Sequence, residues 1–220
     1  MKHAVLILYL IMSAVHLVAS YRDDAVLRRR TKPFLLLLLL LWYVLSARNV
    51  NILLVLALFT SWLGDVLLIP KGHNWFTYGG IAFMFSHLFF VLVFTRQIDF
   101  SNMPVLLLLV LAVVYYGISL RIIFAVRPTT PKKMIAPMYF YLLCNSTMNI
   151  FAFLQMRSLG TRGGVIAYIG AVLFFISDCT LFLVRYYKKP DIIYKKHFTV
   201  MLTYLLGELL IVYGVLLIQG

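Results

Sequence analysis

Charged residues are scarce in this sequence: only 12% of its 220 residues are charged, while 63% are hydrophobic. Soluble globular domains carry about 25% charged and about 45–50% apolar residues. This shortage of charge excludes an ordinary soluble domain and indicates an integral membrane protein. Because repeated apolar segments leave little room for a separate soluble part, we expect residues 1–220 to form one membrane domain.

Cysteine is nearly absent, and the two residues present, Cys144 and Cys179, lie inside apolar segments. This argues against a disulfide framework, and no group of histidine, cysteine and acidic residues has the spacing of metal ligands. The net charge of +13 comes from short basic runs rather than from one extended basic face. We therefore expect no metal, no cofactor and no nucleic-acid partner, and we assign the charge to membrane topology and anionic headgroups.

Apolar runs long enough to cross a bilayer, which needs roughly 20 residues, recur along the chain. The polar cluster Arg48–Asn51 divides the stretch from Pro33 to Ile69, which is too long for one crossing. The second segment is short, so we expect it to stand nearly upright or to end early. The sequence thus predicts an all-α bundle of eight transmembrane helices, at residues 3–20, 33–47, 51–69, 75–95, 103–124, 134–156, 164–187 and 198–218.

The starts of these segments carry two further signals. Pro33, Pro104 and Pro137 lie near predicted starts, where a missing backbone donor costs little. Residues 1–20 also fit a cleaved signal peptide, but the basic run Arg28–Arg30 that follows favours their retention as a first span.

Positive charge alternates between the connections. Fifteen of the 20 lysines and arginines follow odd-numbered segments, and five lie on the other side. The larger set is Arg22, Arg28, Arg29, Arg30, Lys32, Lys71, Arg121, Arg127, Lys132, Lys133, Arg185, Lys188, Lys189, Lys195 and Lys196. Because cytoplasmic connections carry an excess of positive charge, we expect the odd-numbered connections in the cytoplasm, both termini outside, and the plasma (inner) membrane as the location.

Acidic residues are rarer still, and three of the seven, Asp65, Asp178 and Glu208, fall within predicted spans. A carboxylate at membrane depth is costly, so it normally faces a cavity or a partner. Asp65 and Asp178 lie six and seven residues before the basic residues that follow their spans, within roughly 9–11 Å of them at about 1.5 Å per residue. His87 and Glu208 lie nearer the middle of their spans. We therefore expect several titratable groups to share the cytoplasmic half of one bundle.

Polar side chains also recur at helical spacing, and these faces should point into the bundle because lipid would leave their donors unsatisfied. The stripes are Tyr9, Ser13, His16 and Ser20; Tyr141, Asn145 and Asn149; and Tyr204 and Glu208. Hydrogen bonds between helices, worth roughly 0.6 kcal/mol each, explain such stripes without any function. Both explanations stay open for the stripes, whereas a functional role is favoured for Asp65 and Asp178, because a bare carboxylate is a costly packing device.

Four short motifs follow one another on successive spans. They are Thr31-Lys32-Pro33 opening the second span, Ser61 with Gly64-Asp65 late in the third, Phe85-Ser86-His87-Leu88 in the fourth, and Ser177-Asp178 with Leu181 in the seventh. In order, spacing and placement they resemble the lysoplasmalogenase family, the YhhN-like eight-span membrane proteins, and the resemblance runs through most of the chain. In the last span, Glu208 stands where the family pattern leads us to expect glutamine.

The resemblance implies hydrolysis of the vinyl ether bond of lysoplasmalogens, with release of a fatty aldehyde and a glycerophospho-headgroup. This reaction needs a proton delivered to carbon, which creates an oxocarbenium ion, and then attack by water. Like glycoside cleavage, it calls for one carboxylic acid and one carboxylate, roles that a buried pair of aspartates can divide. We expect Asp65 and Asp178 to be that pair, either of them being the acid, and His87 to assist proton transfer or to hold water.

The other candidate residues are expected to bind a lysophospholipid substrate among the membrane lipids. They are Lys32, Ser61, Tyr141, Asn145, Asn149, Ser177, Tyr204 and Glu208. Lys32, at the mouth of the bundle, can meet the lipid phosphate as a point charge, and a purely topological role for this lysine is at least as well supported.

Two other functions fit the same residues. Intramembrane acids and histidines also suit a small proton-coupled transporter, although no span shows the paired glycine and proline interruptions of discontinuous transporter helices. A non-enzymatic lipid-binding protein, in which the acids only join helices, is the third. No ordered Ser-His-Asp set supports a serine hydrolase, and the sequence carries no signal of oligomeric state.

Overall fold

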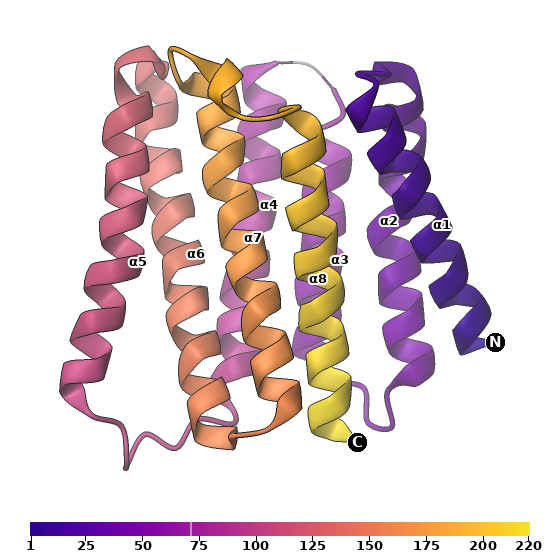
Figure 1. Cartoon of the computed structure of the whole chain (residues 1–220), viewed down its shortest axis with the longest axis vertical. Helices are drawn as coiled ribbons and strands as arrows, with labels where there is room; N and C mark the ends of the chain where they lie inside the picture. The colour runs from indigo at the N-terminus through magenta and orange to yellow at the C-terminus, as the bar shows by residue number, and fades with distance from the viewer. Residues whose placement is uncertain (71) are drawn as a thin grey trace.

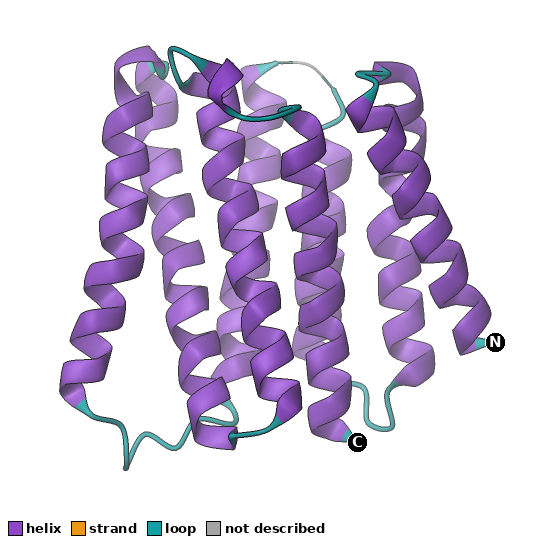
Figure 2. Cartoon of the chain, viewed as in Figure 1, coloured by secondary structure: helices purple, strands orange, loops and turns teal. Residues whose placement is uncertain are grey.

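In the computed structural model, which describes residues 1–70 and 72–220, the chain folds into long helices joined by short connections. The described residues contain eight α-helices and no β-strand, which confirms the predicted all-α bundle (Figure 2). The α-helices are α1 (Lys2–Tyr21), α2 (Ala25–Ser46), α3 (Ile52–Leu67), α4 (His73–Thr95), α5 (Val105–Val126), α6 (Lys132–Leu159), α7 (Arg162–Tyr186) and α8 (His197–Gln219). Two short 3-10 helices, η1 (Arg127–Thr129) and η2 (Pro190–Ile192), lie in connections.

The helices run up and down, so both termini lie at the same end of the bundle (Figure 1). The connections after α1, α3, α5 and α7 gather at the opposite end, which we call the basic end because most lysines and arginines lie there. Lys71, which belongs to this charge pattern, lies outside the described residues.

Six helices form a ring in the order α2, α3, α4, α6, α7, α8, in which each contacts the next and α8 closes onto α2. Outside this ring, α1 packs against α2 and α8, and α5 packs against α6 and α7 (Figure 1). The interior of the ring is therefore screened from lipid, and polar side chains can be buried there.

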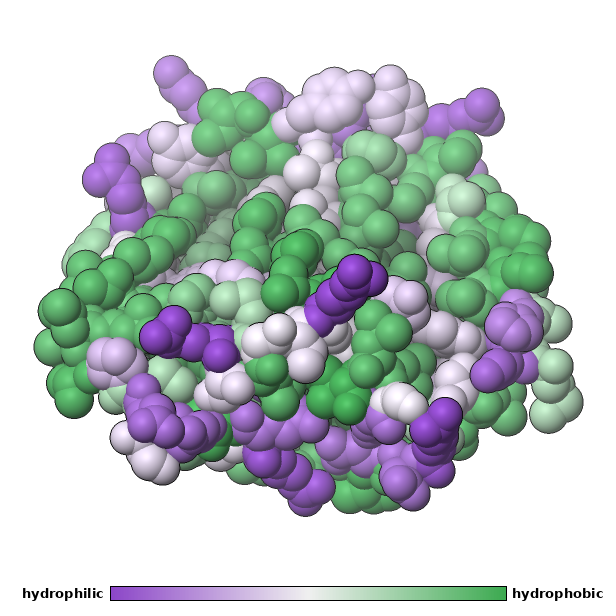
Figure 3. Space-filling view, turned by 60° about the horizontal axis from the view of Figure 1, so that its bottom comes forward, coloured by the Kyte–Doolittle hydropathy of each residue, from purple (hydrophilic) through white to green (hydrophobic). Residues whose placement is uncertain are grey.

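Five of the described helices, α1, α4, α5, α7 and α8, are long and apolar enough to cross a membrane. Helix α3 is apolar but shorter, and α2 and α6 carry basic residues in their first turns. On α5, Val105, Leu106 and Val113 are 70–74% exposed, as side chains in contact with lipid are. Figure 3 shows apolar side chains along the flank and hydrophilic ones gathered toward the ends. The chain is thus a helical membrane bundle.

A polar cap sets the start of α2. The Asp24 carboxylate accepts hydrogen bonds from two backbone amides of the first turn at 3.0 Å each, so the helix begins at Ala25. The expectation of a short second helix starting at Pro33 is therefore wrong, because hydropathy alone leaves out the basic first turns. Pro33 and Pro137 lie inside α2 and α6 rather than near their starts.

Helices α7 and α8 form the most extensive contact in the bundle, and their backbones touch. A Cβ atom on Gly170 would lie 2.6 Å from the Gly207 carbonyl oxygen, and one on Gly207 would lie 2.9 Å from the Gly170 carbonyl oxygen. These spacings leave no room for a methyl group, so glycine is required on both sides. The contact fixes the position of Asp178 on α7 relative to that of Tyr204 on α8.

We expect Gly207→Ala to lower the free energy of unfolding by about 1–3 kcal/mol, because the added methyl group overpacks this contact. Gly117→Ala in α5 is the matched control, since nothing lies within 4 Å of a Cβ atom at Gly117. Denaturant unfolding of the purified protein, followed by tryptophan fluorescence, measures both variants. Equal stability of the two would contradict the close backbone approach.

Candidate active site

Three carboxyl groups lie inside the ring of helices: Asp65 on α3, Asp178 on α7 and Glu208 on α8. These residues are only 1%, 4% and 0% exposed. They are close enough to interact electrostatically. All three face the interior, as the cost of a carboxylate in lipid requires.

Asp65 is held by groups from two neighbouring helices. The Lys32 ammonium group of α2 lies 3.1 Å from Oδ1, and the Tyr204 hydroxyl of α8 donates a hydrogen bond to Oδ2 at 2.9 Å. The Lys32 side chain is only 17% exposed, so this ion pair is largely shielded from water. Thr31, which precedes Lys32 in α2, is anchored to α1, because its hydroxyl lies 2.7 Å from His16 Nδ1. Both oxygens of Asp65 thus have a partner.

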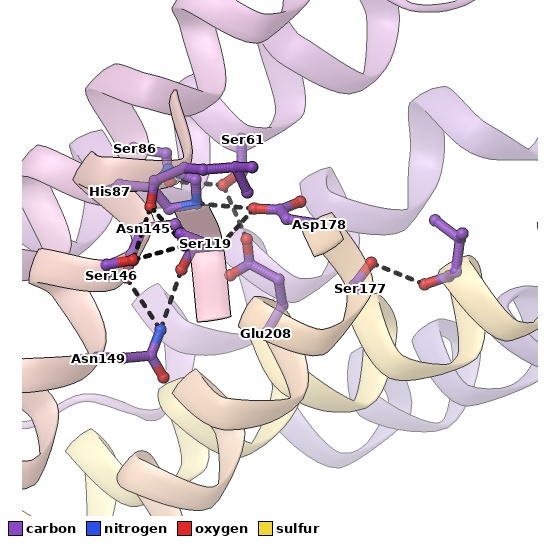
Figure 4. A network of polar contacts seen from close by, with 12 residues as sticks. Ser61, Ser86, His87, Ser119, Asn145, Ser146, Asn149, Ser177, Asp178 and Glu208 are labelled. Atoms are coloured by element: carbon purple, nitrogen blue, oxygen red, sulfur yellow. Dashed lines mark hydrogen bonds and ion pairs between the residues drawn. The ribbon is translucent and has the colours of Figure 1, made fainter. Parts of the chain in front are cut away.

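Asp178 is held from α4 and α6 instead. The Asn145 amide donates to Oδ2 at 2.6 Å, and His87 Nε2 lies 3.2 Å from the same oxygen. The Tyr141 hydroxyl also interacts with this carboxyl group. The buried His87 ring lies between Tyr141 and Phe174, with ring centroids 5.1 and 5.0 Å away. The imidazole is therefore fixed against Asp178, as Figure 4 shows.

Glu208 belongs to a third polar group that adjoins the aspartates. The Ser61 hydroxyl of α3 donates to Oε1 at 2.7 Å, and the Ser86 hydroxyl of α4 lies 2.7 Å from Ser61. Among the described residues, no side chain or backbone group forms a hydrogen bond with the buried Oε2 atom. Figure 4 shows Ser61 and Glu208 beside the pair of Asp178 and His87.

A cavity of about 320 Å³ brings the two aspartates together, and we call it the acid chamber. Its polar lining contains both aspartates with Tyr141, Ser177 and Tyr204, and its basic lining contains Lys32, Arg185 and His197. One ligand in this chamber can therefore contact Asp65 and Asp178 at the same time. The Arg185 guanidinium lies 3.8 Å from the centre of the Phe76 ring, which fixes its position beside the chamber.

A second cavity of about 430 Å³ adjoins the acid chamber, and we call it the basic vestibule. Its lining includes His16, Arg28 and Arg29, and it shares Lys32 and His197 with the chamber. Its described lining contains no acidic residue. The vestibule therefore suits an anionic group such as a phosphate.

The structure brings together most of the residues predicted from the sequence. Those that line the acid chamber are Lys32, Asp65, Tyr141, Ser177, Asp178 and Tyr204, while His87 and Asn145 contact Asp178, and Ser61 contacts Glu208. Ser177 also joins α7 to α8 through a hydrogen bond to the Val200 carbonyl. Asn149 lies one residue further from Asp178: its amide donates to both the backbone and the side-chain carbonyl oxygens of Asn145 at 3.0 Å.

Three residues near the site, Ser86, Arg185 and His197, are not among the candidates predicted from the sequence. Arg185 follows Asp178 by seven residues, which is two helical turns, so both lie on the same face of α7. That spacing was a usable signal, but the arginine also fitted the charge pattern of the connections. Ser86 lies in the motif Phe85-Ser86-His87-Leu88, but neither its contact with Ser61 nor the place of His197 is predictable, because both depend on which helices lie beside them.

Among models of protein families, that of the YhhN family matches residues 27–215. The chain belongs to the YhhN family. The matched region includes every residue that lines the acid chamber. The family includes lysoplasmalogenases, so this YhhN-family chain is a membrane protein of the lysoplasmalogenase family. No curated protein and no solved structure matches the chain.

The arrangement gives this YhhN-family protein two carboxyl groups with different chemical partners. Asp65 faces an ammonium group, and Asp178 faces an imidazole. In the described part of the chain, no three metal-ligating side chains come together as a candidate metal site. The two carboxyl groups of the chamber therefore have unlike surroundings, an ammonium group beside Asp65 and an imidazole beside Asp178.

We expect Lys32→Met to lower the free energy of unfolding by about 3–5 kcal/mol, because it leaves the Asp65 carboxylate buried without its cation. The double variant Lys32→Met/Asp65→Asn should recover most of this loss. Lys196→Met is the matched control, since Lys196 pairs with an exposed Asp191 and exposed pairs contribute little. Denaturant unfolding in detergent measures all three. A Lys32→Met protein as stable as the control would contradict the buried ion pair.

Proposed function

We propose that this YhhN-family protein is a membrane-embedded hydrolase that cleaves the vinyl ether bond of lysoplasmalogen-type lysophospholipids. The products are a fatty aldehyde and a glycerophospho-headgroup. Family membership supports the substrate class. The observation that carries the reaction is that Asp65 and Asp178 line one cavity and have different partners.

The pair of Asp178 and His87 supplies the proton in the first step. The proton passes to the vinyl carbon that is not bonded to oxygen, and the ether oxygen and the adjoining carbon share the resulting positive charge. Asn145 and Tyr141 hold the carboxyl group in place for this transfer. General acid catalysis of this kind contributes typically 10²–10⁴-fold in rate.

Asp65 acts in the second step as the carboxylate. Its ion pair with Lys32 favours the charged form, so in this proposal it stabilises the oxocarbenium ion and then accepts a proton from the attacking water. The resulting hemiacetal breaks at the bond to the glycerol oxygen, which takes the proton from Asp65, while the hemiacetal hydroxyl returns a proton to the pair of Asp178 and His87. One water is consumed, and both aspartates regain their starting state.

The headgroup of the substrate lies toward the basic end in this proposal. Lys32, Arg185 and His197 line the chamber there, and Arg28 and Arg29 line the vestibule beyond it. A lipid phosphate in the vestibule places the ether bond in the chamber, next to the carboxyl groups. The surplus of lysine and arginine supports a cytoplasmic position for this end, in a membrane that we propose to be the plasma (inner) membrane.

We expect purified protein in detergent to release aldehyde from a lysoplasmenyl lipid, and we expect Asp178→Asn and Asp65→Asn each to lower kcat by about 10²–10⁴-fold. Each substitution keeps the shape of the side chain but removes a group that holds charge or exchanges a proton. Aldehyde release measured by a coupled dehydrogenase assay gives the rates.

The matched control for these variants is Asp191→Asn, because Asp191 has a side chain that is 87% exposed and lies at the same end of the bundle. This variant should retain the rate of the unsubstituted protein. Unaltered turnover in Asp65→Asn or Asp178→Asn, with thermal stability preserved, would exclude the proposed carboxylate pair.

The same assay distinguishes hydrolysis from proton-coupled transport. A hydrolase needs no separated compartments, so we expect equal turnover in detergent and in sealed vesicles. Accumulation of intact substrate inside vesicles, driven by a proton gradient and without aldehyde release, would replace this proposal with transport.

A further inference from the structure

A third cavity, of about 380 Å³, lies between α4 and α6, and we call it the apolar pocket. Its lining is almost entirely hydrocarbon and aromatic, with Phe76, Gly80 and Met84 from α4 facing Met138 and Phe140 from α6. This pocket has no part in the chemistry described above. Its chemical character therefore has to be explained separately.

The apolar pocket is reached from the side of the bundle. Ile81, Ala136 and Phe140 line it and are exposed, and in a membrane their surroundings are lipid tails. A cavity with this lining offers a polar solute few hydrogen-bond partners. A hydrocarbon chain that is already dissolved in the bilayer, in contrast, enters it without crossing water.

The three cavities follow one another in a fixed order. The vestibule and the acid chamber share Lys32 and His197, the chamber and the apolar pocket share Phe83, Tyr141 and Leu181, and among the described residues only Leu68 lines all three. The acid chamber therefore lies between a basic cavity and an apolar one. A single-chain lipid has the same order, because its anionic headgroup and its hydrocarbon chain lie on opposite sides of the ether bond.

We infer that the apolar pocket binds the hydrocarbon chain of the substrate, and that Gly80 and Ala136 set how long a chain is accepted. This inference rests on the proposed function, because it takes the substrate to be a lysophospholipid whose ether bond lies in the acid chamber. The vinyl ether is then positioned by contacts on both sides, with the phosphate at one and the chain at the other.

Gly80 offers a direct way to shorten the pocket. A Cβ atom at Gly80 would meet only the Tyr141 ring, at an ordinary 3.9 Å, so a larger side chain extends into the cavity without a backbone clash. Ala136 offers the same possibility from the opposite wall, on α6. Gly117→Leu in α5 is the matched control for Gly80→Leu, because it makes the same change in a helix where the surrounding space is open.

The test measures binding of non-cleavable alkyl-ether lysophospholipids of increasing chain length to the full chain in nanodiscs. Because the chain passes from the bilayer into the pocket, affinity per mole fraction of probe in the bilayer should stay level or rise slightly with each methylene until the pocket is full, and should fall for longer chains. We expect Gly80→Leu and Ala136→Phe to bring this fall several methylenes earlier. Long chains should then bind at least about tenfold more weakly than to the unsubstituted protein, while short chains and the Gly117→Leu variant are unaffected.

Identical chain-length profiles for Gly80→Leu, Ala136→Phe and the unsubstituted protein, with all three stably folded, would overturn the inference. So would the absence of any lysolipid binding to the unsubstituted protein. Because the probe is not cleaved, the result is separate from hydrolysis. A shifted profile without aldehyde release from the vinyl ether lipid would support the chain pocket and reject the proposed reaction.

Discussion

The helix arrangement depends on one constraint: three carboxyl groups inside a membrane bundle must have polar partners. Asp65 takes its partners from α2 and α8, Asp178 from α4 and α6, and Glu208 from α3, whose Ser61 in turn meets α4. These contacts join all six helices of the ring. Helices α1 and α5, which contribute no partner to the three acids, lie outside it. The distribution of buried charge and the helix arrangement therefore have one common cause.

The two aspartates occupy related positions but differ in the chemistry of their neighbours. A lysine beside Asp65 and a histidine beside Asp178 divide the pair into unequal members, although each acid came from a similar sequence context near the end of an apolar span. The two cavities that adjoin the acid chamber differ as well. The vestibule is lined by basic side chains, whereas the other cavity is apolar and opens toward lipid. A symmetric site would not distinguish the two ends of a lipid.

Much of this arrangement was predictable from the sequence. Hydropathy predicts the helices, and the scarcity of intramembrane acids singles out Asp65 and Asp178 correctly as interior groups. Hydropathy alone misses the start of α2 because its first turns are basic, although Asp24 was present as a capping signal. The partner of each acid was not predictable, since it depends on which helices are neighbours. The cavities depend on the sizes of side chains from several helices, which no single periodicity encodes.

The backbone contact between α7 and α8 has a mechanical consequence. Two helices separated by side chains can slide or tilt as those side chains change rotamer, but helices whose glycines touch have no such compliance. Asp178, Tyr204 and Glu208 therefore belong to a pair of helices, α7 and α8, that moves as one rigid unit. Any motion of the bundle that admits or releases a ligand therefore has to come from the other contacts of the ring, of which that between α2 and α8 is the least extensive.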